Sequence, residues 1–168
     1  MVADNWQLAL LNEAADGARV LDCAQRARDY ILLEAGREPD ATWVTGYFND
    51  IPPGRTKEDI LVLGIEQVDG SLTGLLGMAP GYETQSEWYI GLLLVAESER
   101  GNGLGATVLK EVVALAKASG AQTLKVAVLT KNAAGLRFWE RHGFEHLRDA
   151  PDDGQGDGHD RVVLQRRL

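Results

Sequence analysis

The stretch WYIGLLLVAESERGNGL, residues 88–104, decides the fold. Its first eight residues are almost all apolar, which is typical of a strand covered on both faces. A short acidic connection, AESE, leads into a glycine-rich turn, and a long helical pattern begins inside that turn at about Gly103. Backbone N–H groups at such a helix start converge on one space and favour a phosphate there. The stretch therefore predicts a pyrophosphate site.

Length and composition indicate an ordinary globular chain. Of its 168 residues, 45% are hydrophobic and 25% are charged, which fits a soluble protein. This length buries a full core without disulfides, and we expect one domain over residues 1–168. Cys23 is the only cysteine, so an internal disulfide is impossible and a reducing compartment is expected.

The sequence also bounds the location and the partners. The N-terminus lacks the basic start of a signal peptide, and no apolar stretch approaches the ~18 residues of a membrane span. We therefore expect a cytoplasmic protein without a membrane partner. The net charge of −8 argues against nucleic acid as a partner.

Charge is distributed unevenly along the chain. Residues 100–148 contain eight Lys or Arg and three Asp or Glu, whereas the rest contains nine and twenty-two. If these blocks form surfaces, the basic segment suits an anionic cofactor and the acidic surroundings suit a cationic second substrate. The alternative is that the blocks form no patches in space.

The N-terminal segment predicts a strand and then a long helix. The strand is expected over residues 6–12, and Asp16 is expected to cap the helix, which Gly36 ends. Cys23 is expected to pack beside the buried face of this helix. Four apolar residues recur at helical spacing and form that face: Val20, Ala24, Ala27 and Ile31.

Residues 40–79 predict a short helix followed by a hairpin. The helix ATWVTGYFNDI contains three aromatic residues that either line a substrate mouth or pack in the core: Trp43, Tyr47 and Phe48. Strands are expected over residues 60–67 and 72–79, and the Asp-Gly pair between them is a strong hairpin signal.

The glycine turn opens a strand–helix–strand unit. Its helix ends at Gly120 and carries one apolar stripe, made of Leu104, Val108, Val112 and Leu115. The strand that follows, residues 123–129, is expected to lie parallel to the strand at residues 88–95.

The C-terminal segment predicts one short helix and two strands. Asn132 is expected to cap the helix, and Trp139 in its last turn is expected to pack against Phe144 beyond its end. The strands are expected over residues 144–148 and 161–168, on either side of a polar loop.

The turn RGNGLGA, residues 100–106, fits two common phosphate-binding patterns poorly. A P-loop would need Lys-Ser or Lys-Thr after its last glycine, and neither is present. The dinucleotide pattern G-x-G-x-x-[GA] matches at Gly101, Gly103 and Ala106, but it lacks the acidic residue about 20 positions later that holds a ribose. A nicotinamide-dependent oxidoreductase is therefore the weaker alternative.

A third pattern, R-x-x-G-x-G, matches at Arg100, Gly103 and Gly105 and belongs to a longer series. The chain contains, in order, LLLV, AESE, RGNGLG, a long helix, TLKVAVL, Asn132, LRFWER and HGF. Over residues 88–144 this series resembles the GCN5-related N-acetyltransferase (GNAT) family. The resemblance implies an α/β (α+β) fold with a mixed, mostly antiparallel twisted sheet of six or seven strands. A parallel central pair and about four flanking helices complete that fold.

The resemblance also implies acetyl-CoA as the cosubstrate. The pyrophosphate would lie on backbone N–H groups of the turn, and the pantetheine arm would pair with the open edge of the strand before it. The implied cofactor-binding residues are Leu93, Leu94, Val95, Arg100, Gly101, Asn102, Gly103, Leu104, Gly105, Ala106, Asn132 and Trp139. Arg137 and Arg141 either reach the phosphates or are simply solvated.

The implied reaction is direct transfer of the acetyl group from the thioester to an amine. A backbone N–H near Leu94 would polarise the thioester carbonyl, as an oxyanion site does. In many family members a tyrosine in the short helix protonates the departing sulfur. That position is Trp139 here, and an indole has no accessible acid proton. Tyr82 and Tyr89 are candidate substitutes, and water or unassisted departure of the thiolate is the alternative.

Glu83 and Glu87 are the candidate bases, because they lie beside the strand where substrates enter in the family. Surface solvation is the alternative role for each. No metal site is expected: Gly143 interrupts the helix between His142 and His146, and the acidic residues of the late loop lack calcium-loop spacing. The acceptor amine, small-molecule or protein-borne, is not identified, and homodimers are common in the family. The second functional hypothesis is an inactive module that binds acyl-CoA.

Overall fold

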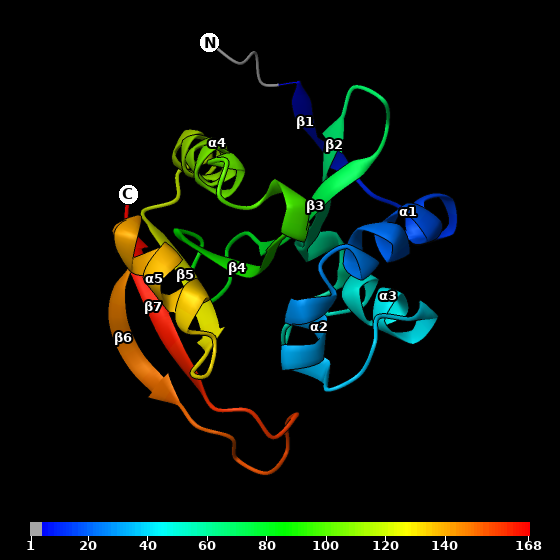
Figure 1. Cartoon of the computed structure of the whole chain (residues 1–168). Helices are drawn as coiled ribbons and strands as arrows, with labels where there is room; N and C mark the ends of the chain where they lie inside the picture. The colour runs from blue at the N-terminus through cyan, green and yellow to red at the C-terminus, as the bar shows by residue number, and fades with distance from the viewer. Residues whose placement is uncertain (1–4) are drawn as a thin grey trace.

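The apolar run before the glycine turn becomes strand β4 (Glu87–Val95), in the middle of a seven-stranded sheet. Figure 1 shows the computed structural model, which describes residues 5–168. The other strands are β1 (Trp6–Leu10), β2 (Leu61–Gln67), β3 (Leu72–Ala79), β5 (Thr123–Leu129), β6 (Glu145–Ala150) and β7 (Arg161–Arg167). Their order is β1-β2-β3-β4-β5-β7-β6, and only β4 and β5 are parallel neighbours. The predicted fold class is confirmed.

Two expectations reach beyond the described residues. The domain predicted over residues 1–168 and the N-terminus without a signal peptide both include residues 1–4, which lie outside the part that the structure describes. Among the described helices, none combines the length and apolarity that a membrane crossing requires.

The described part of the chain forms five α-helices, one more than the sequence predicts. They are α1 (Glu13–Gln25), α2 (Arg28–Ala35), α3 (Ala41–Phe48), α4 (Leu104–Ala118) and α5 (Ala133–Arg141). The extra helix arises because the long helix predicted up to Gly36 breaks at Arg26 and Ala27. The break allows the Arg26 carbonyl to accept a hydrogen bond from the Glu97 N–H (2.9 Å). The four residues predicted for the apolar face of the long helix are nevertheless all fully buried.

Two predicted details of the helices are wrong. Asn12, not Asp16, caps α1, because the Asn12 Oδ1 accepts hydrogen bonds from the N–H groups of Ala14 (3.0 Å) and Ala15 (3.2 Å). The Asp16 carboxylate instead accepts from the Asn12 N–H (2.7 Å), and this bond lowers the pKa of Asp16. In α4, Leu115 is 42% exposed, and the buried stripe consists of Val108, Leu109, Val112, Val113 and Ala116.

Two hydrophobic cores cover the two faces of the sheet. One core joins α4 and Trp139 of α5 to the strands, and the other packs α1, α2 and α3 against β3 and β4. Figure 1 shows α4 on one side of the sheet and α1 to α3 on the other. Cys23 is fully buried in the second core, and burial raises its pKa to about 11. This confirms the packing role that the sequence predicts for Cys23.

The predicted helix ends are confirmed. Gly120 follows α4 with φ of 85°, and Gly143 follows α5 with φ of 83°. Phe144 donates its N–H to the Trp139 carbonyl (3.1 Å), and the two rings lie 4.9 Å apart between centroids. The predicted contact between these residues therefore fixes the path from α5 into β6.

An irregularity in β4 opens the centre of the sheet. In the pairing with β3, Gly77 faces Leu92 and Met78 faces Ile90, so Gly91 is an extra residue in β4. The parallel pairing of β4 with β5 extends from Glu87 only to Ile90. Beyond that point β4 leaves β5. In the described part of the chain, residues 91–95 therefore have no strand on the edge that faces β5, while residues 92–95 pair with β3 on their other edge.

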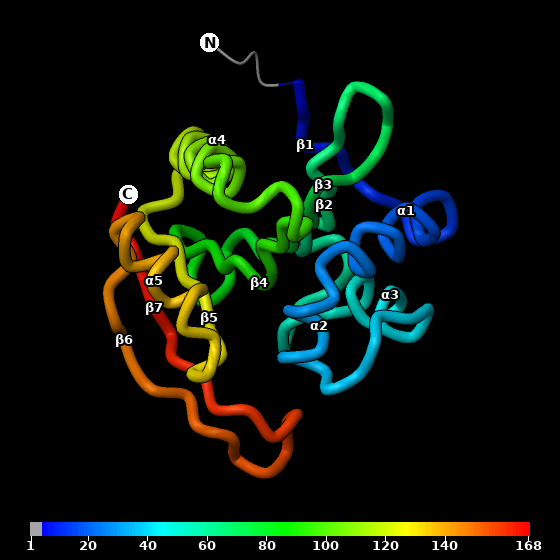
Figure 2. Tube along the Cα trace, in the orientation of Figure 1, coloured from blue at the N-terminus to red at the C-terminus, as the bar shows by residue number. Residues whose placement is uncertain are grey.

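The loop between β6 and β7 returns toward the other half of the molecule. Figure 2 traces it from the edge of the sheet toward α2. There the Nε2 of His159 lies 2.7 Å from the Glu34 carbonyl oxygen. Arg161 pairs with Asp157 (2.5 Å) and lowers the pKa of that carboxyl to about 2. The loop that the sequence predicts as polar is thus held at its C-terminal end.

Gly74 in β3 gives a direct test of the packing between β3 and β4. A Cβ at this position would lie 2.5 Å from the Leu94 backbone oxygen, which cannot move without shifting β4. Gly74→Ala should therefore lower the free energy of unfolding by about 1–3 kcal/mol, measured by urea denaturation. In the control Gly46→Ala, the new methyl group meets nothing within 4 Å, and a helix interior favours alanine by about 0.5–1 kcal/mol. Equal effects of the two substitutions would contradict this packing.

Candidate active site

A cavity of about 490 Å³ lies where β4 and β5 separate. Its walls come from the end of β4, the glycine turn, the end of β5 and α5. All the residues that the sequence assigns to the cofactor except Asn102 line it: Leu93, Leu94, Val95, Arg100, Gly101, Gly103, Leu104, Gly105, Ala106, Asn132 and Trp139. Of the two arginines of α5, Arg141 lines the cavity and Arg137 is exposed outside its lining.

The glycine turn presents backbone donors to this cavity. Gly101 and Gly103 have φ of 80° and 82°, values that residues with a side chain rarely adopt. The first helical hydrogen bond of α4 runs from the Thr107 N–H to the Gly103 carbonyl (3.0 Å). The N–H groups before Thr107 therefore have no partner within the helix. The Arg100 N–H is different, because it already donates to the Glu97 carbonyl (3.2 Å).

Gly105 brings α4 and α5 together at the cavity wall. A Cβ on Gly105 would lie 3.3 Å from the Phe138 ring, which is closer than ordinary packing allows. The ring of Phe138 therefore covers the first turn of α4 and closes one side of the cavity. The last glycine of the R-x-x-G-x-G pattern thus has a packing role.

The Arg100 side chain fastens the turn to α2. Its guanidinium donates to the Val95 carbonyl (2.9 Å) and pairs with both carboxylate oxygens of Asp29 (2.5 and 2.9 Å). The hydrogen bonds from Arg100 lower the pKa of Asp29. Because these bonds occupy the guanidinium, the structure gives the side chain a fastening role rather than a free charge in the cavity.

Asn132 caps α5 at the edge of the cavity. Its Oδ1 accepts a hydrogen bond from the Gly135 N–H (2.9 Å). A side chain at Gly135 would overlap the Asn132 amide, since an added Cβ would lie 2.5 Å from Nδ2. The oxygen is thus committed to the helix, and the Asn132 amide nitrogen is the end that can donate to a ligand.

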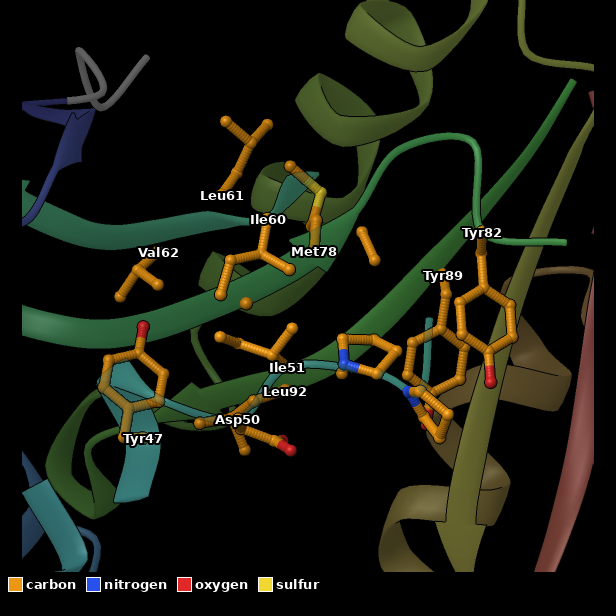
Figure 3. Close-up of a pocket in the computed structure, with 15 residues that line it drawn as sticks. Tyr47, Asp50, Ile51, Ile60, Leu61, Val62, Met78, Tyr82, Tyr89 and Leu92 are labelled. Carbon is orange, nitrogen blue, oxygen red and sulfur yellow. The ribbon is translucent and has the colours of Figure 1, made fainter. Parts of the chain in front are cut away.

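A smaller cavity of about 240 Å³ lies on the other side of the β4 irregularity. Figure 3 shows Tyr47 at one end and Tyr82 and Tyr89 together at the other. The rings of Tyr82 and Tyr89 stack with centroids 4.8 Å apart. The two cavities share Gly91 and Leu92 as lining residues, so they meet at the extra residue of β4.

The sequence predicts that the three aromatic residues of α3 either line a substrate mouth or pack in the core, and the structure shows both kinds of placement. Phe48 is 5% exposed and belongs to the core. Tyr47 lines the smaller cavity with its ring, and its hydroxyl donates to the carbonyls of Leu63 (3.0 Å) and Leu76 (3.2 Å). Trp43 stacks on Tyr47 with centroids 5.8 Å apart and so supports this wall from outside.

The comparisons with known proteins assign the family. Residues 24–144 match the Acetyltransferase (GNAT) family. The chain belongs to the GNAT acetyltransferases. Members of this family transfer an acetyl group and use acetyl-CoA as cosubstrate. The mostly antiparallel sheet is also unlike the doubly wound parallel sheet of dinucleotide-binding proteins, so the oxidoreductase alternative is dropped.

Solved structures show the same fold. An acetyltransferase from Thermus thermophilus aligns with a TM-score of 0.76 and 21% identity, over 98% of this chain and 97% of that one. Ard1 from Thermoplasma volcanium aligns with a TM-score of 0.66 and 16% identity over 98% of each chain. Nourseothricin acetyltransferase aligns with a TM-score of 0.57 and 21% identity over 65% of each chain. A comparison with curated protein sequences gives no match.

Within this GNAT cavity, Trp139 occupies a packed position. It is 6% exposed, and its ring lies against those of Phe138 and Phe144 with centroids 5.1 and 4.9 Å apart. Packing is therefore the observed role of Trp139, and its indole offers no acid proton to the cavity. The cavity instead contains one tyrosine that the sequence does not indicate, Tyr30 of α2.

The Tyr30 phenol is set up to remain protonated. It packs against the core that contains Leu94, close to the end of β4. Burial raises the pKa of Tyr30, and the nearby Glu34 carboxylate raises it further. A phenol in this state keeps its proton at neutral pH and can donate a hydrogen bond. Helical spacing in the sequence places Tyr30 only beside an apolar face, so nothing in the pattern marks it.

The two predicted bases do not line either cavity. Glu83 and Glu87 both pair with Lys125, through Nζ–O distances of 2.7 and 3.1 Å. Burial alone would lower the pKa of Lys125, but the hydrogen bonds to Glu83 and Glu87 outweigh it and raise the pKa. The three residues form an ion-pair cluster at the closed end of the β4–β5 pair. Tyr82, the other catalytic candidate, does line the smaller cavity.

The two histidines considered as ligands point to different partners. His142 Nδ1 lies 2.7 Å from the Phe138 carbonyl oxygen, and His146 Nε2 lies 2.8 Å from Asp149. Within residues 5–168, no three His, Cys, Asp or Glu side chains gather closely enough to hold a metal ion.

The Lys125 cluster predicts a stability effect. Lys125→Met should lower the free energy of unfolding by about 1–3 kcal/mol, because it leaves two carboxylates facing each other without their shared donor. Lys125→Arg should recover most of the loss because it keeps the charge. Exposed Lys131 supplies the matched control, and Lys131→Met should stay within about 0.5 kcal/mol of the parent. Equal urea midpoints for both methionine variants would mean that the cluster is not stabilising.

Proposed function

We propose that this protein is a single-domain N-acetyltransferase, residues 1–168, which transfers the acetyl group of acetyl-CoA to an amine. The observation that carries the proposal is the larger cavity, which combines the row of N–H donors at the start of α4 with the unpaired edge of β4. A ligand with a pyrophosphate at one end and an amide-rich arm at the other satisfies both sets of backbone groups. Coenzyme A has this chemistry.

In the proposed complex, the pyrophosphate lies on the N–H groups from Gly101 to Ala106. A hydrogen bond to a charged group contributes about 1.5–3 kcal/mol, and the helix N-terminus adds roughly 0.3–1 kcal/mol. A few such contacts supply much of the ~8 kcal/mol behind micromolar affinity. The pantetheine arm extends along Leu93, Leu94 and Val95 like an added strand, and the Asn132 amide nitrogen donates to it.

The amine approaches from the smaller cavity and attacks the thioester carbonyl beside Gly91 and Leu92. The attack forms the C–N bond, and collapse of the tetrahedral intermediate breaks the C–S bond. A backbone N–H beside Leu94 on the open edge of β4, that of Leu93 or Val95, stabilises the oxyanion. The Leu94 N–H itself faces β3, because it has the same direction as the Ala96 N–H, which donates to the Thr73 carbonyl.

The ammonium form of the acceptor first gives one proton to water on the side of the smaller cavity, where Tyr82 contacts the acceptor, and the nitrogen gives a second proton to water after the attack. Coenzyme A leaves as the thiol after Tyr30 gives its proton to the sulfur, and the Tyr30 phenolate then regains a proton from water.

The phosphate assignment predicts the effect of charge in the turn. Gly103→Asp should weaken coenzyme A binding at least tenfold, because it places a carboxylate among the proposed phosphate donors. Isothermal titration calorimetry measures the affinity. Gly120→Asp is a matched control, because Gly120 has nearly the same φ, 85° against 82°, at the opposite end of α4. Equal affinities in two folded variants would show that the phosphates lie elsewhere.

The proposal that Tyr30 protonates the departing sulfur leads to a second prediction. Tyr30→Phe should lower kcat at least tenfold while leaving coenzyme A affinity unchanged, because a positioned acid typically contributes 10²- to 10⁴-fold. Release of free thiol from acetyl-CoA, measured over a panel of amines, gives kcat. The double variant Tyr30→Phe with Trp139→Tyr places a phenol on α5 and should recover part of the loss. An unchanged kcat in Tyr30→Phe would show that the thiolate leaves without this proton.

Because the Trp139 indole has no acid proton to donate, a second candidate function is a module that binds acyl-CoA without catalysing a reaction. The same amine panel separates the two functions. Tight coenzyme A binding without thiol release for any amine would support the module.

A further inference from the structure

We propose that the smaller cavity binds the acceptor as a primary ammonium group attached to a small apolar or aromatic body that carries no carboxylate. The inference rests on the proposed function, because it names the class of amine that receives the acetyl group. Its physical basis is separate and lies in the charge, shape and position of this cavity.

The smaller cavity lies next to the proposed site of the reaction. Gly91 and Leu92 line both cavities, so a molecule in the smaller one reaches the wall behind which the thioester would lie. Gly91 is the extra residue of β4 and adds no side chain to the wall that the two cavities share. The amine would therefore meet the thioester at Gly91 and Leu92.

The lining is apolar and aromatic along most of its surface. It comes from the segment after α3, from β2 and β3, and from the beginning and middle of β4, and includes Ile51, Pro52, Pro53, Ile60, Met78 and Ala79. Three tyrosines contribute rings. The Tyr47 hydroxyl is already bonded to two backbone carbonyls. Burial raises the pKa of Tyr89 to about 12, so its ring stays neutral.

Of the described residues that line the smaller cavity, Asp50 is the one acid, and none is a Lys, Arg or His. Figure 3 shows Asp50 on the same side of the cavity as Leu92. Among the described residues, Asp50 takes part in no ion pair within 4 Å. The smaller cavity thus has one exposed carboxylate on the side of Leu92 and aromatic faces around it. Both features favour a cation.

Two arginines lie close to tyrosines of this cavity. Arg55 donates to the Tyr82 carbonyl (2.8 Å), which holds the loop before β4. Arg161 affects the pKa of Tyr89 but is paired with Asp157, and neither arginine lines the cavity. An amino-acid acceptor would therefore bring its carboxylate into a cavity whose described lining contains no positive side chain. An unpaired charge that loses its water is strongly disfavoured.

The volume sets the size of the acceptor. About 240 Å³ is below the ~300–1,000 Å³ that is usual for a drug-sized ligand. A phenyl ring or a short alkyl chain fits this space, with the ammonium directed to Asp50 and Leu92. Phenethylamine and phenylalanine differ only in the carboxylate and therefore isolate the feature that matters.

Binding tests the inference without depending on turnover. Isothermal titration into protein saturated with coenzyme A should show phenethylamine binding at least tenfold more tightly than phenylalanine. Asp50→Asn should remove at least tenfold of the phenethylamine affinity and leave coenzyme A affinity unchanged. Glu58→Gln, an exposed carboxylate change outside the lining, should alter neither affinity. Asp50→Arg should shift the preference toward phenylalanine.

The outcomes separate the inference from the proposed function. Equal or tighter binding of phenylalanine, or no binding of either compound, would overturn the inference. Thiol release with amino acids or with peptide N-termini but not with simple amines would overturn it too, and would leave the N-acetyltransferase proposal standing. Phenethylamine binding that depends on Asp50, without thiol release for any amine, would support the site while removing the proposed catalysis.

Discussion

The extra residue Gly91 in β4 is the constraint on which the rest of the site depends. Between Met78 and Gly77, which are consecutive in β3, β4 advances by two residues, from Ile90 to Leu92. Such a bulge bends a strand, and the parallel pairing of β4 with β5 stops at Ile90. Residues 91–95 then have no described strand partner on their β5 side, in the middle of the sheet, although residues 92–95 still pair with β3 on the other side. Buried backbone groups need hydrogen-bond partners, so this edge favours a ligand that supplies amide groups. At the same bend, Gly91 and Leu92 line both cavities.

An opened sheet must be held open by contacts from other elements. The connection after β4 is bonded to the break between α1 and α2 through the Glu97 N–H and the Arg26 carbonyl, and to α2 through Arg100 and Asp29. The Arg100–Asp29 pair is substantially exposed, and such pairs contribute only about 0–1 kcal/mol each. Their effect is better understood as positional: they set the distance between α2, which carries Tyr30, and the glycine turn.

The sequence predicts the features that depend on neighbouring residues. The glycine turn, the caps and ends of α4 and α5, the Trp139–Phe144 contact and the hairpin all follow from local spacing. The mostly antiparallel sheet with a parallel central pair follows from the family resemblance. The features that it misses depend on residues far apart in the chain. The apolar run of β4 gives no sign that Gly91 is a bulge. Lys125 attracts Glu83 and Glu87 from distant positions in the chain, and Tyr30 enters the cavity from α2.

The proposed cofactor site depends on neighbouring residues, whereas the proposed proton transfers depend on residues from distant parts of the chain. The proposed cofactor site lies mainly on one continuous segment, so the spacing of neighbouring residues is enough to predict it. The protons of the proposed reaction move in two separate spaces, since the amine enters through the smaller cavity and the thiol leaves in the larger one. No single residue needs to serve both spaces, and a phenol on either α2 or α5 can reach the sulfur side. A tryptophan at position 139 is therefore compatible with catalysis provided that another element supplies the proton.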